Sequence, residues 1–209
     1  EQKRTAARER ILAAAAQAMR RDGPDRVSVA RVMADAGLTH GAFYSYFASK
    51  DELIAEAMAA AGARFKQKLY EAASDGHPRE RFRKMGDAYL SLEHRADPAN
   101  GCQIAALGPE LARASDGIAE AYEAKVHEIV GMIESTIEGA YGPHEGNRAA
   151  AIGTLAQVVG GMVLSRAMRN DEDARKVLEA CRATLFDTHS ARGRAIDEAG
   201  ATDGKISDC

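Results

Sequence analysis

Apolar residues recur at helical spacing along most of the chain. Close to its start, Ile11, Ala15 and Met19 repeat every four residues, and Leu12 widens the stripe. A stripe with this period lies on one face of a helix and can be buried against a core. With Gly, Pro and Asp as breaks, the pattern predicts helices over residues 5–21, 27–35 (29–35 if Ser28 is the cap), 38–47, 49–73, 78–95, 102–113, 116–141, 143–168 and 172–190.

These helices predict an all-α protein with a small head and a larger body. Residues 1–48 form a three-helix head, and residues 49–190 form a helical body. The run 49–52 reads Ser-Lys-Asp-Glu, a capping box that starts a long helix between the two. Residues 191–209 lack apolar periodicity, so we expect a disordered tail there.

A helix-turn-helix layout is visible inside the head. Gly37 can stop one helix in the left-handed conformation, and Thr39 can cap the next. Phe43 and Phe47 are four residues apart, so both face the core. The residues left outside are Thr39, His40, Ala42, Tyr44 and Ser45. A short helix with an apolar back and a small polar front suits insertion into a DNA major groove.

Charge is distributed unevenly along the chain. The formal net charge is −3, but residues 1–50 hold nine Lys or Arg and five Asp or Glu, a net +4. The remainder therefore carries −7, which is typical of a basic DNA-binding head on a body that does not bind DNA. The chain shows no signal peptide and no run of about 18 apolar residues, so a soluble cytoplasmic protein without a membrane partner is expected.

The sequence contains no catalytic motif that we recognise. It has no phosphate-binding glycine loop, no His-Glu-x-x-His, no Cys-x-x-Cys and no nucleophile elbow. Its three Cys are too few and too scattered for a disulfide framework or a zinc cluster. We therefore predict no catalytic residue, no metal ligand and no cofactor, and no enzyme activity.

One stretch resembles the signature of a known family. The residues Gly37-Leu38-Thr39, the run 41–47 (Gly-Ala-Phe-Tyr-Ser-Tyr-Phe) and the run 49–53 (Ser-Lys-Asp-Glu-Leu) are similar, in order and spacing, to the TetR family of bacterial transcription regulators. The resemblance covers about the first quarter of the chain. It implies a homodimeric DNA-binding regulator, in most cases a repressor, that releases a palindromic operator when an effector binds.

The resemblance also implies which residues contact DNA. Thr39, Tyr44 and Lys50 match positions that usually touch phosphates, and Ser28 could do the same from its helix cap. His40 and Ala42 are candidates for base edges. The full predicted set is Ser28, Thr39, His40, Gly41, Ala42, Tyr44, Ser45 and Lys50.

The resemblance further implies that the last two helices pair with their copies in a dimer. The adjacent Gly160 and Gly161 each cost roughly 1 kcal/mol in a helix interior, which close approach of another helix would offset. The alternative is that the same helices pack only within one chain. The predicted interface is Leu155, Val159, Gly160, Gly161, Val163, Leu178 and Leu185.

The effector is less well specified by the sequence. Candidate pocket residues are Met85, Tyr89, Cys102, Leu107, Tyr122, Met132 and Met162, although such positions are often ordinary core. The segment that begins Gly101-Cys102 resembles one in a branch of these regulators, some of which sense electrophiles or oxidants through a Cys here. The effector is therefore a small molecule or an electrophile, and a buried Cys that only fills space is the alternative.

The sequence is also compatible with a protein of a different class. The body could bind a protein partner or act as an enzyme, with a head that no longer binds DNA. The sequence also does not separate a repressor from an activator, and it does not reveal the operator or the effector.

Overall fold

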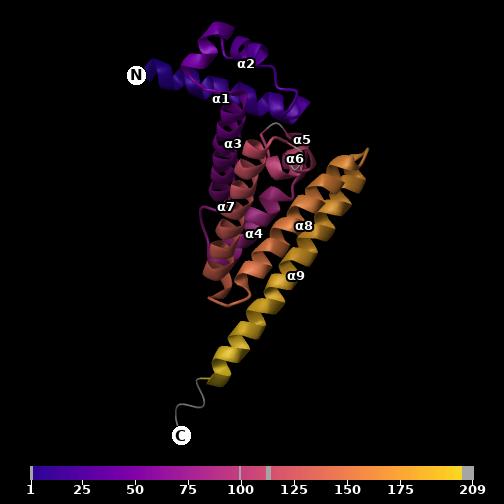
Figure 1. Cartoon of the computed structure of the whole chain (residues 1–209). Coiled ribbons are helices and arrows are strands. Elements are labelled where there is room, and N and C mark those ends of the chain that lie inside the picture. Colours follow the sequence, from indigo (N-terminus) through magenta and orange to yellow (C-terminus); the bar gives the residue numbers. More distant parts are fainter. Residues whose placement is uncertain (1, 99, 112–113, 204–209) are drawn as a thin grey trace. The chain divides into compact units, whose positions relative to one another are not determined.

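The computed structural model is helical throughout the part of the chain that it describes, residues 2–98, 100–111 and 114–203, with Pro109 and the last seven residues described by backbone alone. This confirms the predicted all-α class. The elements, drawn in Figure 1, are α1 (Gln2–Asp22), α2 (Val29–Asp35), the 3₁₀ helix η1 (His40–Ser45), α3 (Lys50–Ala72), α4 (Pro78–Tyr89), α5 (Leu92–Ala96), α6 (Gln103–Leu111), α7 (Asp116–Tyr141), α8 (Asn147–Ala167) and α9 (Asp171–Asp203).

The helix predicted over 78–95 is interrupted. Leu90 leaves helical geometry with φ −89° and ψ 51°. Its carbonyl accepts a hydrogen bond from Arg182 Nη1 at 2.9 Å, and Ser91 Oγ accepts the His94 N–H at 3.1 Å to start α5. Partners from a distant helix and a local cap therefore satisfy groups that an unbroken helix would have paired.

The predicted tail begins as an ordered helix. Helix α9 runs on to Asp203, and residues 204–209 lie outside the described part of the chain. The extension is held by polar and glycine contacts. Arg192 Nη2 donates to Asn147 Oδ1 at 2.7 Å, and a Cβ on Gly193 would lie 2.8 Å from Tyr141 Cδ1. Helix α9 thus continues into the segment 191–209, for which a disordered tail was expected, and polar contacts of this kind leave no apolar period in the sequence.

The chain divides into two compact units. The first is Glu1–Lys68 with Ala96–Val126, and the second is Leu69–Arg95 with His127–Cys209. The core of the first unit joins the head to residues from α6 and α7, among them Leu107, Leu111 and Ile118. The division therefore does not follow the boundary expected at residue 48, because the head shares its core with helices that come later in the chain.

Helices α8 and α9 run side by side as a long pair in the second unit (Figure 1). Gly161 lies at their contact, where a Cβ would meet Cys181 Sγ at 2.6 Å and Leu90 Cδ2 at 3.4 Å. Any larger side chain at this position would push α9 away. The close approach that we expected at this glycine thus occurs within a single chain.

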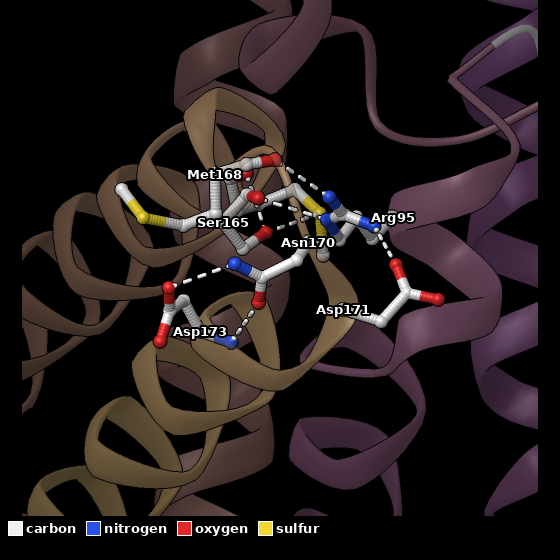
Figure 2. A network of polar contacts seen from close by, with 7 residues as sticks. Arg95, Ser165, Met168, Asn170, Asp171 and Asp173 are labelled. Atoms are coloured by element: carbon white, nitrogen blue, oxygen red, sulfur yellow. Dashed lines mark hydrogen bonds and ion pairs between the residues drawn. The ribbon is translucent and has the colours of Figure 1, made fainter.

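Arg95 of α5 binds the turn between α8 and α9 (Figure 2). Its guanidinium donates to the carbonyls of Ser165 and Met168 at 2.8 and 2.9 Å, and it pairs with Asp171 at 2.7 Å. Asn170 caps α9, since its side-chain oxygen accepts a backbone N–H of the first turn at 2.8 Å. One cation therefore satisfies carbonyls at the end of α8 and a carboxylate at the start of α9.

A buried histidine joins four helices of the same unit. The ring of His189 lies 4.8 Å from the ring of Phe82 and 5.7 Å from that of Tyr141, and its Nε2 is 2.8 Å from Thr154 Oγ1. Its Nδ1 is enclosed without a hydrogen-bond partner among the described residues. Burial, and then the charge of Arg192, lower the pKa of His189, which keeps the ring neutral near pH 7.

Candidate nucleic-acid interface

Helix α2 and the turn after it follow the predicted cap chemistry. Ser28 has extended backbone angles, and its Oγ accepts the Arg31 N–H at 3.4 Å. Gly37 has φ +73°, the left-handed conformation that closes α2. Arg10 of α1 adds a tertiary contact, because its Nε donates to the Ala36 carbonyl at 3.2 Å. The end of α2 is thus fixed both locally and by α1.

The segment after the turn is a 3₁₀ helix, whereas an α-helix over 38–47 was predicted. Thr39 occupies the cap position, but its side chain makes no capping hydrogen bond. The bonds are of the shorter 3₁₀ kind, with Ala42 N–H donating to Thr39 O at 3.1 Å and Tyr46 N–H to Phe43 O at 2.9 Å. Because Thr39 is exposed and its hydroxyl does not cap the helix, this hydroxyl is available to a binding partner.

Two phenylalanines anchor this segment to the core. Phe43 and Phe47 are both buried, and their rings stack with centroids 5.9 Å apart. Burial of two aromatic side chains is worth several kcal/mol, which is enough to hold a short helix in place. The prediction that both residues belong to the core is confirmed.

The opposite face of η1 is open to solvent. Thr39, His40, Gly41 and Ser45 are exposed, and Tyr44 is 75% exposed, touching Phe43 only edge-on at 5.2 Å. The remaining predicted residue of this face, Ala42, is half-buried and packs against the core with part of its surface. A Cβ on Gly41 would meet nothing within 4 Å, so packing inside the chain does not require glycine there.

Lys50 was predicted to contact a DNA phosphate, and in the structure it binds a backbone carbonyl of the head. Its Nζ donates to the Asp25 carbonyl at 2.7 Å, which ties the start of α3 to the turn before α2. The capping box beside it is present: Ser49 Oγ accepts the Glu52 N–H at 3.1 Å, and the Glu52 carboxylate accepts the Ala48 N–H. Lys50 therefore has a structural partner in addition to any role toward DNA.

Three arginines of α1 hold the head together, which the sequence reasoning missed. Arg4 Nη2 donates to the Ser45 carbonyl at 2.7 Å, and its guanidinium lies 5.9 Å from the centre of the Tyr46 ring. Arg8 stacks over Phe47 at 5.0 Å and forms an ion pair with Glu56. Arg4, Arg8 and Arg10 therefore direct part of the positive charge of the head to contacts within the chain.

Other cations of the head face solvent. Lys3, Arg26 and Arg31 have exposed side chains that form no hydrogen bond or salt bridge with the described residues. Arg26 and Arg31 flank the start of α2, next to Ser28. Their position beside a helix N-terminus is the sequence signal that could have marked them as candidate phosphate contacts.

The family comparison fits this geometry. Residues 11–57, which span the second half of α1 through the first part of α3, match the family model described as bacterial regulatory proteins, tetR family. Residues 11–57 therefore carry a TetR-type DNA-binding domain. No curated protein sequence matches it.

Solved structures of TetR regulators share the fold over most of the chain. A TetR regulator from Cytophaga hutchinsonii matches with TM-score 0.74 and 19% identity, covering 90% of this chain and 96% of that one. One from Chloroflexus aurantiacus matches with TM-score 0.72 and 21% identity over the same shares. NemR of E. coli in its reduced form matches with TM-score 0.69 and 20% identity, covering 84% and 94%. At these identities the likeness concerns the fold.

The predicted effector residues are divided between the two units. In the first unit Cys102 and Leu107 are buried and Tyr122 is half-buried, with Leu107 in the core that includes the head. Burial, and then the nearby Cys102, raise the pKa of Tyr122. The remaining four lie in the second unit: Tyr89 and Met162 are buried, and Met85 and Met132 are half-buried.

The sequence reasoning missed a polar neighbour of Cys102. Cys102 directly precedes α6, and its carbonyl accepts the Ala106 N–H at 3.2 Å. Gln103, the first residue of α6, is only 6% exposed, and its Nε2 has no hydrogen-bond partner among the described residues. Buried amide groups are nearly always paired, so this nitrogen marks a place where an acceptor would be stabilised.

The predicted dimer residues fall into two groups. Leu155, Gly161, Leu178 and Leu185 are buried by packing inside the second unit, whereas Val159 and Gly160 are half-buried and Val163 is 45% exposed. The exposed face of α8 also contains Ile152 and Leu164, at 52% and 56% exposure. Helix α8 is long and apolar enough to cross a membrane by length and composition, a test that the core helix of a soluble protein also passes.

Proposed function

We propose that this regulator is a repressor that binds a palindromic DNA operator as a homodimer in the cytoplasm. The observation that carries the proposal is η1, a short helix whose phenylalanines are buried while its outer side chains face solvent. Such an element can enter a major groove without disturbing its own core. In a two-fold dimer, two copies of η1 would read half-sites about 34–36 Å apart.

The contacts divide by chemistry. Tyr44, Thr39 and Ser28 carry exposed hydroxyl groups that can bind phosphate oxygens. His40 can hydrogen-bond a purine edge, and the exposed part of Ala42 can meet a thymine methyl. Gly41 permits close approach of the backbone, and Ser45 lies at the edge of the same face. Lys50 is a weaker candidate, because its ammonium group already has a carbonyl partner.

Selection of binding sites from random-sequence duplex DNA tests the proposal. The parent should select a palindrome and should bind it with strong salt dependence. Tyr44→Phe should weaken binding to all sequences alike, and His40→Ala should change the preferred base at one position of each half-site. Thr188→Ala, at an exposed site on α9, is the control. Absence of any sequence preference in the parent would favour a partner-binding or enzymatic body with a head that does not bind DNA.

The dimer contact is proposed on the exposed face of α8. Ile152, Val163 and Leu164 are the large apolar side chains there. Ile152 and Val163 fall 11 residues apart, which places them on one face of the helix, and Leu164 lies beside Val163, roughly a quarter of a turn further round. Burial of this face against a second copy would remove it from water, and the neighbouring helix α9 would complete a four-helix contact.

The effector is proposed to be a small molecule that binds reversibly next to the start of α6. The Nε2 of Gln103 is an unpaired hydrogen-bond donor, and Cys102 lies near enough to Tyr122 to contribute to its raised pKa. A ligand that binds one conformation of the protein better than the other would lower the population that is competent for DNA. Covalent modification of Cys102 is the second candidate, favoured by its place at the N-terminus of a helix.

A further inference from the structure

Glu56 of α3 forms an ion pair with Arg8 of α1, and the two side chains are 30% and 38% exposed. Both residues belong to the first unit. Neither lies on the outer face of η1, and neither is among the predicted DNA contacts. The pair can still affect that face, because the same guanidinium also contacts a residue directly after η1.

That residue is Phe47. The Arg8 Cζ lies 5.0 Å from the centre of its ring, a distance at which a cation is attracted by an aromatic face. Phe47 is 2% exposed, its ring stacks on that of Phe43, and its N–H donates to the Phe43 carbonyl at 3.1 Å. Arg8 therefore contacts the side chain that holds the end of η1 to the core.

The Glu56 carboxylate fixes the Arg8 side chain in this place. An arginine has many rotamers, and a ring contact at a partly exposed position selects among them only weakly. The carboxylate adds a charge-assisted hydrogen bond, which it accepts from Arg8 Nη2. One cation thus connects α1, the end of η1 and α3, and Glu56 decides whether that cation stays at the ring of Phe47.

We propose that Glu56 is a positioning residue for DNA recognition, which acts through Arg8 and Phe47 on the orientation of η1. Without the carboxylate, the guanidinium leaves the ring and η1 samples more orientations. Fewer molecules then present the arrangement that fits base edges, which lowers the apparent affinity for the preferred sequence. The inference rests on the proposed function, in which η1 reads the major groove.

The proposal predicts an effect opposite in sign to that of charge alone. Glu56→Ala removes a negative charge and frees the positive charge of Arg8, so electrostatic attraction by itself would tighten binding to any DNA. Loss of positioning instead weakens binding to the preferred sequence, because base contacts need η1 in place and phosphate attraction does not. The ratio of the affinities for preferred and shuffled DNA separates these two effects.

The probes are the palindrome that the parent selects from random-sequence duplexes and a shuffled duplex of the same length. Glu56→Ala should lower the affinity ratio about fivefold, the upper end of what a partly exposed ion pair contributes. Asp22→Ala is the matched control, since Asp22 pairs with Arg21 at 2.8 Å within α1. It changes the charge equally and should keep the parent's ratio. In an Arg8→Met background, Glu56→Ala should not change the ratio further.

Hydrogen exchange in the absence of DNA tests the same link. The Phe47 amide should exchange about fivefold faster in Glu56→Ala than in the parent, and at the parent's rate in Asp22→Ala. Unchanged exchange in Glu56→Ala would overturn the proposal.

Two results of the DNA experiment would also overturn it. One is an affinity ratio that falls equally in Glu56→Ala and Asp22→Ala. The other is an unchanged ratio in Glu56→Ala together with a lower melting temperature, which would reduce the ion pair to a stabilising contact. Failure of the parent to prefer any sequence would contradict the proposed function instead, and the exchange rates would still decide whether Glu56 holds Phe47 in place.

Discussion

Replacing Arg4 with alanine separates two roles that a basic residue in a DNA-binding head can have. In the structure the Arg4 guanidinium binds the Ser45 carbonyl at 2.7 Å and lies 5.9 Å from the Tyr46 ring. Hydrogen bonds from charged groups contribute about 1.5–3 kcal/mol, and less where both groups are exposed, as here. The ring contact is near its limit of about 6 Å and adds little. We expect a loss of about 1 kcal/mol, or about fivefold in DNA affinity, for each head.

The assay is the dependence of DNA affinity on salt concentration. A residue that only positions η1 changes the affinity and leaves the salt slope unchanged, whereas loss of a phosphate contact reduces the slope by about 0.9. Arg26→Ala is the matched control, because the Arg26 side chain is exposed and forms no hydrogen bond or salt bridge with the described residues. It should reduce the slope. Arg4→Lys keeps the charge and can still donate one hydrogen bond to a carbonyl, so it should bind DNA more tightly than Arg4→Ala.

Hydrogen exchange gives a second reading of the same variant. The amides of Tyr46 and Phe47 donate to the Phe43 carbonyl at 2.9 and 3.1 Å, directly after the residue that Arg4 binds. Their exchange should become about fivefold faster in Arg4→Ala, because local opening costs about 1 kcal/mol less. Unchanged exchange together with a reduced salt slope would refute the positioning role and make Arg4 a phosphate contact.

Three further predictions concern the rest of the chain. Leu164→Arg should sediment as a monomer, because a charge buried in an apolar dimer contact is costly. Its helical circular-dichroism spectrum should not change, because the Leu164 side chain is 56% exposed within one subunit. Dimers of this variant would place the contact elsewhere. Since the pKa of His189 is lowered on folding, its neutral form stabilises the protein above the unfolded pKa of about 6.5, and this is lost as the pH falls below it. The melting temperature of the parent should therefore fall more steeply between pH 7.5 and 5 than that of His189→Gln, and equal slopes would contradict this. One equivalent of N-ethylmaleimide should leave DNA binding intact, because Cys102 is only 6% exposed; release of DNA by the parent but not by Cys102→Ser would show that modification is the signal.

The sequence alone determined the features that depend on local chemistry. Ser28 caps α2 and Gly37 closes it in the left-handed conformation, as expected from residue type. Phe43 and Phe47 are buried as their four-residue spacing indicated. These features could be read directly because each involves groups only a few residues apart, as does the spacing of the motif that marks the family.

Tertiary structure decided which surfaces are used and which are covered. The apolar period of α8 indicated a buried face, but only packing against α9 shows that Gly161 is covered within the chain while Leu164 stays open. Likewise, nothing local in the sequence indicated that Arg4 would bind the Ser45 carbonyl, 41 residues away, or that two nitrogens of Arg20 would be enclosed. A helical period specifies the direction in which a side chain points, whereas its partner depends on how distant helices pack, and that information is not local to any stretch of sequence.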